Sequence, residues 1–141
     1  MLLYNPQNIF ARILRGELPC IKLYEDAHTL AFMDIMPQVD GHALVIPKEA
    51  AVTLPELSDE AAAACMRTVK KLSVAVQAAM QSPGIVVLQL NGADAGQTVP
   101  HVHFHIIPSA LKTLMREHAS RMEEPEKLKA FAARIIAELD R

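Results

Sequence analysis

Residues 101–107 have the sequence His101-Val102-His103-Phe104-His105-Ile106-Ile107, an apolar run with histidine at every second position. Since successive side chains of a strand point to opposite faces, the three histidines are expected together on one face. The intervening apolar side chains then fill the core on the other face. Half of the chain's six histidines lie within these five positions, 101 to 105. This run predicts a strand at an active site.

Two chemistries could use such a row of imidazoles. Residues four apart on a strand, such as His101 and His105, stand roughly 13 Å apart, whereas a zinc ion needs each ligand nitrogen at about 2.0–2.1 Å. The outer two histidines are therefore not expected to share one ion, and the sequence predicts no metal site. A row of this length better suits an extended anionic substrate, with one imidazole attacking and its neighbours donating hydrogen bonds or protons.

Length and charge limit the classes of protein to consider. The 141 residues predict a single domain, 1–141, large enough to bury its own core. A net charge of −2, a pI near 6.3 and the lack of a basic stripe argue against a nucleic-acid partner. The first six residues lack the features of a secretory signal, and no apolar run is long enough to span a bilayer. We therefore expect a cytoplasmic protein with no membrane partner.

The remaining pattern predicts an α+β fold. Asn5 and Pro6 suit the N-cap and first residue of a short N-terminal helix that ends at Gly16. One long helix is expected from Ser58 to the Pro83-Gly84 pair, and a C-terminal helix over about 123–140. Candidate strands cover residues 21–24, 29–32, 42–47, 85–90 and the histidine run. Together they predict a five-stranded antiparallel sheet, while residues 109–122 have no assignable pattern.

These motifs resemble those of the histidine triad (HIT) family. Residues 101–107 match the family pattern His-φ-His-φ-His-φ-φ, where φ is apolar, and Ala95-Gly96-Gln97-Thr98-Val99 resembles the family's phosphate loop. Residues 32–37 and 41–48 fit it as well, so that the resemblance runs from about 8 to 108. It implies a HIT-like version of the predicted fold.

The resemblance also implies a reaction, the hydrolysis of nucleoside phosphoramidates or adenylyl conjugates at the α-phosphate. In this reading His103 is the nucleophile and forms a nucleotidyl-histidine intermediate. His101 orients it by accepting a hydrogen bond at its backbone carbonyl. His105 contacts a phosphate oxygen or assists proton transfer, and Thr98 lies near the leaving group. The resemblance implies a purine nucleotide or nucleoside phosphoramidate as substrate and no cofactor.

The family also implies a nucleotide pocket. Asp34 is expected to take the ribose hydroxyls and Ile35 to lie beside the sugar. His42 is expected to support the triad, and backbone amides around Gly96 and Gln97 to approach the phosphate. The base is expected between the apolar side chains of Ile9, Phe10, Ile13 and Phe32.

Three departures from the family pattern bear on these expectations. Zinc-binding members carry Cys-x-x-Cys where this chain has Asn8 to Ala11, and a histidine where it has Ala50, so no structural zinc is expected. Leu90 replaces a phosphate-contacting Asn or Gln, for which Asn91 or Gln89 would have to substitute. Ser109 stands where arginine is common, which would alter the choice of leaving group.

Other functions remain open on the sequence alone. A dinucleoside polyphosphate hydrolase is the nearest alternative, and a weakly catalytic nucleotide-binding adaptor is another. In the family a glutamine at the last histidine marks nucleotidyl transfer, so His105 favours hydrolysis. The resemblance further implies a homodimer, with an apolar interface expected at the helix from Ser58 and the strand from Ile85.

Overall fold

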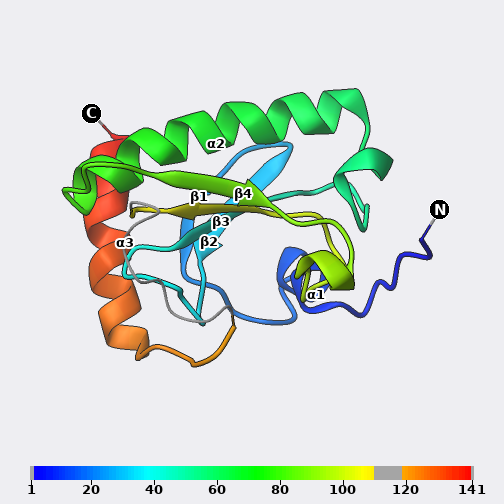
Figure 1. The fold of residues 1–141 in the computed structure, drawn as a ribbon, viewed down its shortest axis with the longest axis horizontal. Coiled ribbons are helices and arrows are strands. Elements are labelled where there is room, and N and C mark those ends of the chain that lie inside the picture. The colour runs from blue at the N-terminus through cyan, green and yellow to red at the C-terminus, as the bar shows by residue number, and fades with distance from the viewer. Residues whose placement is uncertain (1, 110–118, 141) are drawn as a thin grey trace.

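The computed structural model describes residues 2–109 and 119–140, and the chain forms an α+β fold as predicted (Figure 1). Its five strands form one antiparallel sheet in the order β1-β2-β3-β5-β4. The strands are β1 (Lys22–Glu25), β2 (Thr29–Met33), β3 (Ala43–Pro47), β4 (Val86–Gln89) and β5 (Phe104–Ile107). The α-helices are α1 (Ile9–Leu14), α2 (Asp59–Ala79) and α3 (Pro125–Leu139), with 3₁₀ turns at η1 (Leu54–Glu56) and η2 (Ala93–Ala95).

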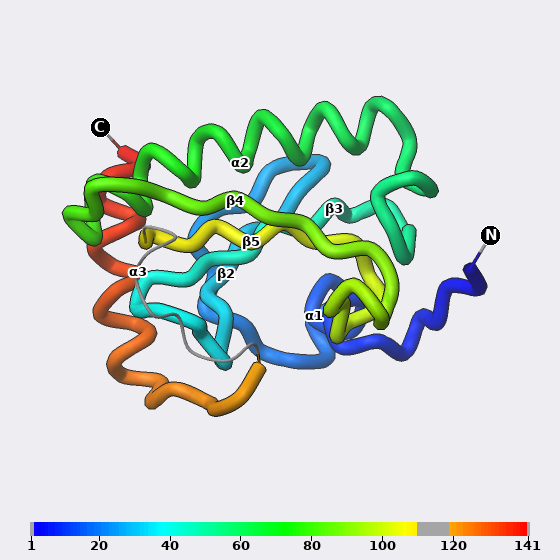
Figure 2. The backbone as a smooth tube through the Cα atoms, in the orientation of Figure 1, coloured from blue at the N-terminus to red at the C-terminus, as the bar shows by residue number. Residues whose placement is uncertain are grey.

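The two faces of the sheet carry separate apolar clusters. On β2 and β3, Ala31, Met33, Ala43 and Val45 pack with α2 and α3 in the larger cluster. The alternating residues Leu30, Phe32, Leu44 and Ile46 pack with Phe10 of α1 in the smaller one. Figure 2 shows α2 along the sheet, α3 across one end and α1 away from both. This period of two leaves one face of the sheet for structural packing and the other for α1.

β5 lies between β3 and β4, and its alternation is as predicted. Val102, Phe104 and Ile106 belong to the cluster under α2, so the histidines occupy the α1 face. The predicted strand start at His101 is wrong, because regular pairing begins only at Phe104. Before that point Val102 N donates to the carbonyl of Ala51, beyond the end of β3, at 2.9 Å. This bond holds the segment extended outside the regular ladder.

Helix α1 starts later than predicted. Asn8, and not Asn5, is its N-cap, because the Asn8 Oδ1 accepts from Ala11 N at 2.9 Å. Asn5 and Pro6 form a preceding turn, in which the Asn5 carbonyl accepts from Asn8 N at 3.1 Å. The cap at Ser58 is confirmed, since its hydroxyl accepts from Ala61 N at 3.1 Å. Both helices thus begin where a side-chain oxygen satisfies an otherwise unbonded amide.

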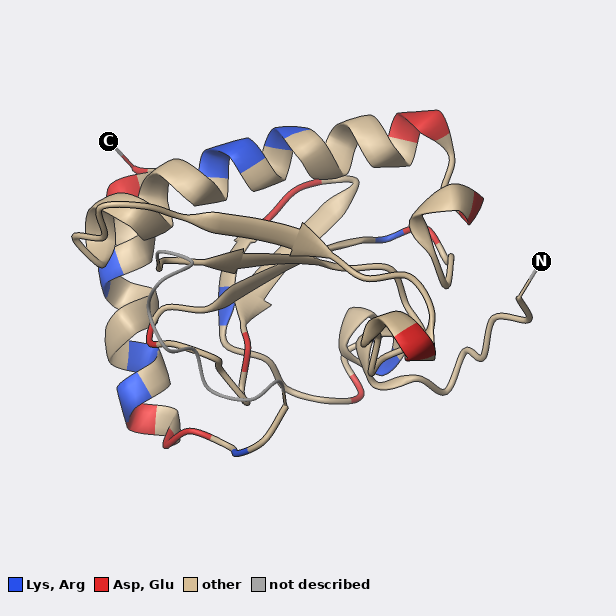
Figure 3. Ribbon diagram, viewed as in Figure 1, with Lys and Arg blue, Asp and Glu red and all other residues tan. Residues whose placement is uncertain are grey.

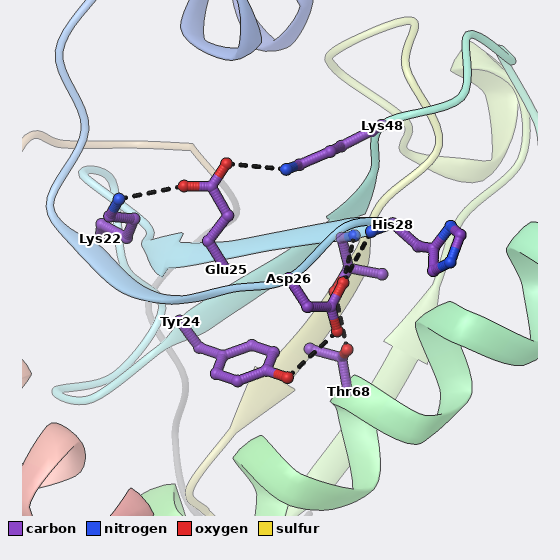
Figure 4. Close-up of polar contacts among 8 residues, drawn as sticks. Lys22, Tyr24, Glu25, Asp26, His28, Lys48 and Thr68 are labelled. Carbon is purple, nitrogen blue, oxygen red and sulfur yellow. Dashed lines mark hydrogen bonds and ion pairs between the residues drawn. The ribbon is translucent and has the colours of Figure 1, made fainter.

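The β1–β2 turn is fixed by the Asp26 side chain (Figure 4). Its Oδ1 accepts from the backbone amides of His28 and Thr29, both at 2.8 Å, and its Oδ2 accepts from the Tyr24 hydroxyl at 3.1 Å. Burial raises the pKa of this carboxyl, but the hydrogen bonds outweigh burial and leave the pKa below its usual value. The Thr29 hydroxyl lies 2.7 Å from that of Thr68, which joins the hairpin to α2.

Charged side chains are dispersed over the outer surfaces of the helices. Figure 3 shows acidic residues at the start of α2, basic residues along its middle, and both signs along α3. The basic residues of α2 are Arg67, Lys70 and Lys71. None of the helices in the described ranges combines the length and apolar character needed to cross a membrane.

Candidate active site

A cavity of about 250 Å³ opens on the α1 face of the sheet. His103 and His105 of the triad line it, together with Asp34, Ile35 and Thr98. Its remaining walls are mostly apolar, and Ile9, Phe10, Ile13 and Phe32 all contribute to them as predicted. The volume lies near the lower end of the range for small-molecule sites, roughly 300–1,000 Å³. The cavity therefore combines a few titratable groups with an apolar pocket.

The orientation of His103 follows from one hydrogen bond. Its Nδ1 lies 2.7 Å from the backbone carbonyl of His101, which confirms the predicted contact. A carbonyl oxygen can only accept, so the proton is on Nδ1 and the lone pair on Nε2. Phe10 packs against the ring with centroids 5.0 Å apart at 90°. His103 is thus held as a neutral imidazole with one nucleophilic nitrogen.

A second chain of bonds sets the tautomer of His105. The backbone N–H of Gln38 donates to His42 Nδ1 at 3.1 Å, which in the neutral ring places the His42 proton on Nε2. His42 Nε2 lies 2.9 Å from His105 Nδ1 and donates to it. His105 consequently carries its own proton on Nε2. The ring centroids of His103 and His105 are 5.0 Å apart, so a donor stands beside the nucleophile.

Asp34 joins this second chain. Its Oδ2 lies 3.5 Å from His42 Nε2, and its Oδ1 accepts from Met36 N at 2.8 Å. A carboxylate beside two hydrogen-bonded imidazoles stabilises an additional proton on the pair. Asp34 also lines the cavity. It can therefore serve both the predicted contact with a sugar and the charge on His42 and His105.

His101 has a different environment from the other two members of the triad. It is completely buried, its Nε2 donates to the Pro47 carbonyl at 2.9 Å, and its Nδ1 accepts from the Tyr4 hydroxyl at 2.6 Å. Burial lowers the pKa of its imidazole below the usual value. His101 is not among the residues that line the cavity. These contacts agree with the orienting role expected of it.

The loop before β5 differs from its predicted role. Gly96 adopts φ +102°, a conformation that favours glycine. However, the amides of Gly96 and Gln97 donate to the carbonyls of Ala93 and Gly92 at 3.0 and 3.1 Å. The Gln97 side chain donates to the Val52 and Val99 carbonyls. The amides predicted to contact phosphate are thus engaged within the loop, whereas Thr98 lines the cavity.

The predicted nucleotide contact of Asn91 is not supported. Its Oδ1 accepts from Leu54 N at 2.8 Å and from Gln89 Nε2 at 2.9 Å, and its Nδ2 donates to Gln89. Neither side chain lines the cavity. Both candidates to substitute for the polar residue that Leu90 replaces are therefore tied to each other and to the start of η1. Ser109, buried near the end of α2, also lies outside the cavity lining.

Several cavity residues were not predicted from the sequence. Pro19 and Cys20 come from the segment before β1, Val99 follows the loop before β5, and Ala119 lies before α3. Burial raises the pKa of the Cys20 thiol. None of these positions carries a catalytic residue pattern, and their common position depends on the fold. Only their apolar character would have suggested a pocket wall.

The titratable groups do not suit a metal ion. Ligand atoms of Asp34, His42 and His105 lie within 4.8 Å of one another. Yet the Gln38 N–H at His42 Nδ1 keeps a proton on His42 Nε2, the atom that would face the ion. At the position of the family's zinc site, Asn8 caps α1. Both ring nitrogens of His101 are engaged by Tyr4 and Pro47.

Comparisons with known proteins agree with this geometry. The family model described as the HIT domain matches residues 15–111, a range that starts somewhat later than the expected 8–108. An adenosine 5'-monophosphoramidase of Schizosaccharomyces pombe is 52% identical over 100 residues, which cover 71% of this chain and 72% of that protein. An adenylylsulfatase of Arabidopsis thaliana is 37% identical over 129 residues, covering 92% and 66%.

A solved structure resembles the whole fold. The crystal structure of a Hit-like protein from Bartonella henselae aligns with a TM-score of 0.89 and 40% identity. The alignment covers 96% of this chain and 99% of that one. The similarity therefore extends beyond the region of the family model to include α3.

Proposed function

The chain belongs to the HIT family, and we propose that it hydrolyses nucleoside phosphoramidates or adenylyl conjugates at the α-phosphate through a nucleotidyl-histidine intermediate. One observation carries the proposal: His103 faces an apolar cavity with its proton fixed on Nδ1, and His105 offers an N–H beside it. The names of two relatives, a phosphoramidase and an adenylylsulfatase, support a hydrolase of adenylyl compounds.

The reaction has two steps. His103 Nε2 attacks the α-phosphorus, a new N–P bond forms, and the bond to the leaving group breaks. An amine leaves as a neutral molecule only if it takes up a proton, which His105 Nε2–H supplies and the pair with His42 shares. Water then attacks phosphorus and releases the nucleoside monophosphate and His103. Its proton returns to the His105 and His42 pair.

The cavity also suits the nucleoside. The base would lie between Phe10 and Phe32, whose rings are 5.4 Å apart in an edge-to-face arrangement, and the aliphatic residues around them. The Asp34 carboxylate would accept hydrogen bonds from the ribose hydroxyls. Donors for the phosphate oxygens would be His105 and Thr98, because the amides of Gly96 and Gln97 are engaged. A purine has the area to fill such a pocket.

Substrate preference tests the proposal. We expect kcat/KM for adenosine phosphoramidate to exceed that for a diadenosine polyphosphate by about tenfold or more, a difference of about 1.4 kcal/mol. The histidine pair protonates an amine leaving group, whereas among the described residues that line the cavity none is a lysine or arginine to meet a polyphosphate's charge. Release of AMP and ATP by chromatography measures both rates. Faster cleavage of the dinucleotide would identify the alternative hydrolase instead.

We also propose a cytoplasmic homodimer, with residues 1–141 forming one domain. Both cysteines are free thiols, as expected in a reducing compartment. β4 is an edge strand, and Val87 on it and Val74 and Met66 on α2 are exposed apolar residues. A Val74→Lys, Val87→Lys double variant should sediment as a monomer at micromolar concentration, where the wild type sediments as a dimer. A monomeric wild type would disprove the dimer.

A further inference from the structure

We propose that Tyr4 is a positioning residue for the nucleophile, which it holds in place through the buried His101. This inference rests on the proposed function, because it assigns a role in the same reaction. Tyr4 is 97 residues from His101 in the sequence, and its hydroxyl lies 2.6 Å from His101 Nδ1. No sequence motif marks Tyr4.

The direction of each hydrogen bond follows from groups that can only accept. The Pro47 carbonyl accepts from His101 Nε2–H at 2.9 Å, so in the neutral ring Nδ1 has a lone pair and accepts the Tyr4 proton. The carbonyl of His101 in turn accepts from His103 Nδ1–H at 2.7 Å. The chain of bonds thus starts at the Tyr4 hydroxyl and ends at the nucleophilic ring.

Burial makes the tyrosine hydroxyl matter. His101 is completely buried, and burial lowers the pKa of its imidazole. A ring in this position cannot compensate for a missing donor by taking up a proton at low cost. Without the hydroxyl, His101 would have to shift or admit water to satisfy Nδ1. Its own carbonyl, which fixes the tautomer of His103, would move with it.

The N-terminal segment is connected to the nucleophile a second time. The side chain of Tyr4 is partly buried, although Leu3 before it is 98% exposed. The next residue, Asn5, accepts from Asn8 N at the start of α1. Helix α1 then presents Phe10 to the His103 ring. Figure 1 shows the segment leading directly into α1. Ordering of residues before α1 is therefore linked to the catalytic geometry through two routes.

The variant Tyr4→Phe removes only the hydroxyl. We expect kcat for adenosine phosphoramidate to fall about five- to tenfold, the rate equivalent of one hydrogen bond. The Kd for AMP, measured calorimetrically, should change less than about twofold, because Tyr4 does not line the cavity. The matched control is Tyr24→Phe, which removes the hydroxyl that bonds Asp26 in the β1–β2 turn and should leave kcat unchanged. An unchanged kcat in Tyr4→Phe overturns the inference.

A double-mutant cycle tests whether Tyr4 acts through His101. In a His101→Asn background, Tyr4→Phe should have no further effect on kcat. The same five- to tenfold loss in that background would show that Tyr4 acts by another route and would overturn the inference. If wild-type protein fails to turn over either substrate, the proposed function fails instead.

A measurement without substrate then decides the role of Tyr4. Solvent exchange of the His103 Nδ1–H proton, followed by NMR, should be about fivefold faster in Tyr4→Phe than in the wild type. Equal exchange in the two proteins would overturn the inference. This measurement also applies if His101→Asn does not fold.

Discussion

The His103→Ala variant is expected to lose turnover of adenosine phosphoramidate by about 10³-fold or more while it still binds AMP. The ring supplies the only atom that bonds to phosphorus in the proposed reaction, so its removal eliminates the covalent route and leaves the binding contacts. Release of AMP measures kcat, and calorimetry measures the Kd for AMP, which should change by less than about fivefold. The apolar pocket and Asp34 account for this retained affinity.

An exposed histidine provides the control. His28 lies in the β1–β2 turn, where its backbone amide bonds Asp26 and its side chain is exposed (Figure 4). His28→Ala should therefore keep wild-type kcat. If His103→Ala also kept a rate within tenfold of the wild type, the protein would be a nucleotide-binding adaptor or would use another nucleophile.

The His105→Gln variant is expected to lose about 10²–10⁴-fold in kcat on the phosphoramidate. Glutamine retains an N–H donor but cannot pass on a proton from His42. The loss should shrink to about tenfold or less on the 4-nitrophenyl ester of AMP, whose leaving group departs as a stable anion. Both rates come from the release of AMP.

The comparison of the two substrates isolates proton transfer from phosphate binding. Equal losses on the amine and ester substrates would mean that His105 stabilises the phosphate and donates no proton. A His42→Phe variant should follow the same pattern, since His42 reaches the reaction only through His105. Its activity loss should therefore also be smaller on the ester.

Periodicity explains which parts of the fold could be predicted. The alternation in residues 101–107 placed Val102, Phe104 and Ile106 in one cluster and the histidines on the opposite face. It did not place the start of β5, because Val102 N bonds Ala51 rather than a partner in the regular ladder. The strand period depends on local backbone geometry, whereas its ends depend on partners distant in the sequence.

The same distinction applies to capping and to the loop. Asn5-Pro6 and Asn8 are both suitable helix starts, and the choice of Asn8 follows from the bond between its side chain and Ala11 N. The amides of Gly96 and Gln97 were expected at the phosphate, but the loop folds into η2 and uses them itself. Competition between local and ligand bonds cannot be decided from residue types alone.

The candidate site was predicted in its chemistry and missed in its supports. The resemblance indicated His103, the His101 carbonyl and His42, and all lie in one chain of contacts or beside it. Tyr4 and Cys20 were not found, because a tyrosine or cysteine in a segment without a motif has many roles. Their positions depend on how the N-terminal segment and the residues before β1 pass the sheet.

Intact-mass spectrometry tests the central claim most directly. Protein mixed with adenosine phosphoramidate would be quenched within milliseconds in alkaline denaturant, since the N–P bond of a nucleotidyl-histidine is labile in acid. We predict one nucleoside monophosphate per chain, mapped to His103 by peptide fragmentation and absent from His103→Ala. Substrate turnover with no adduct at any quench time, or an adduct on another residue, would contradict the account.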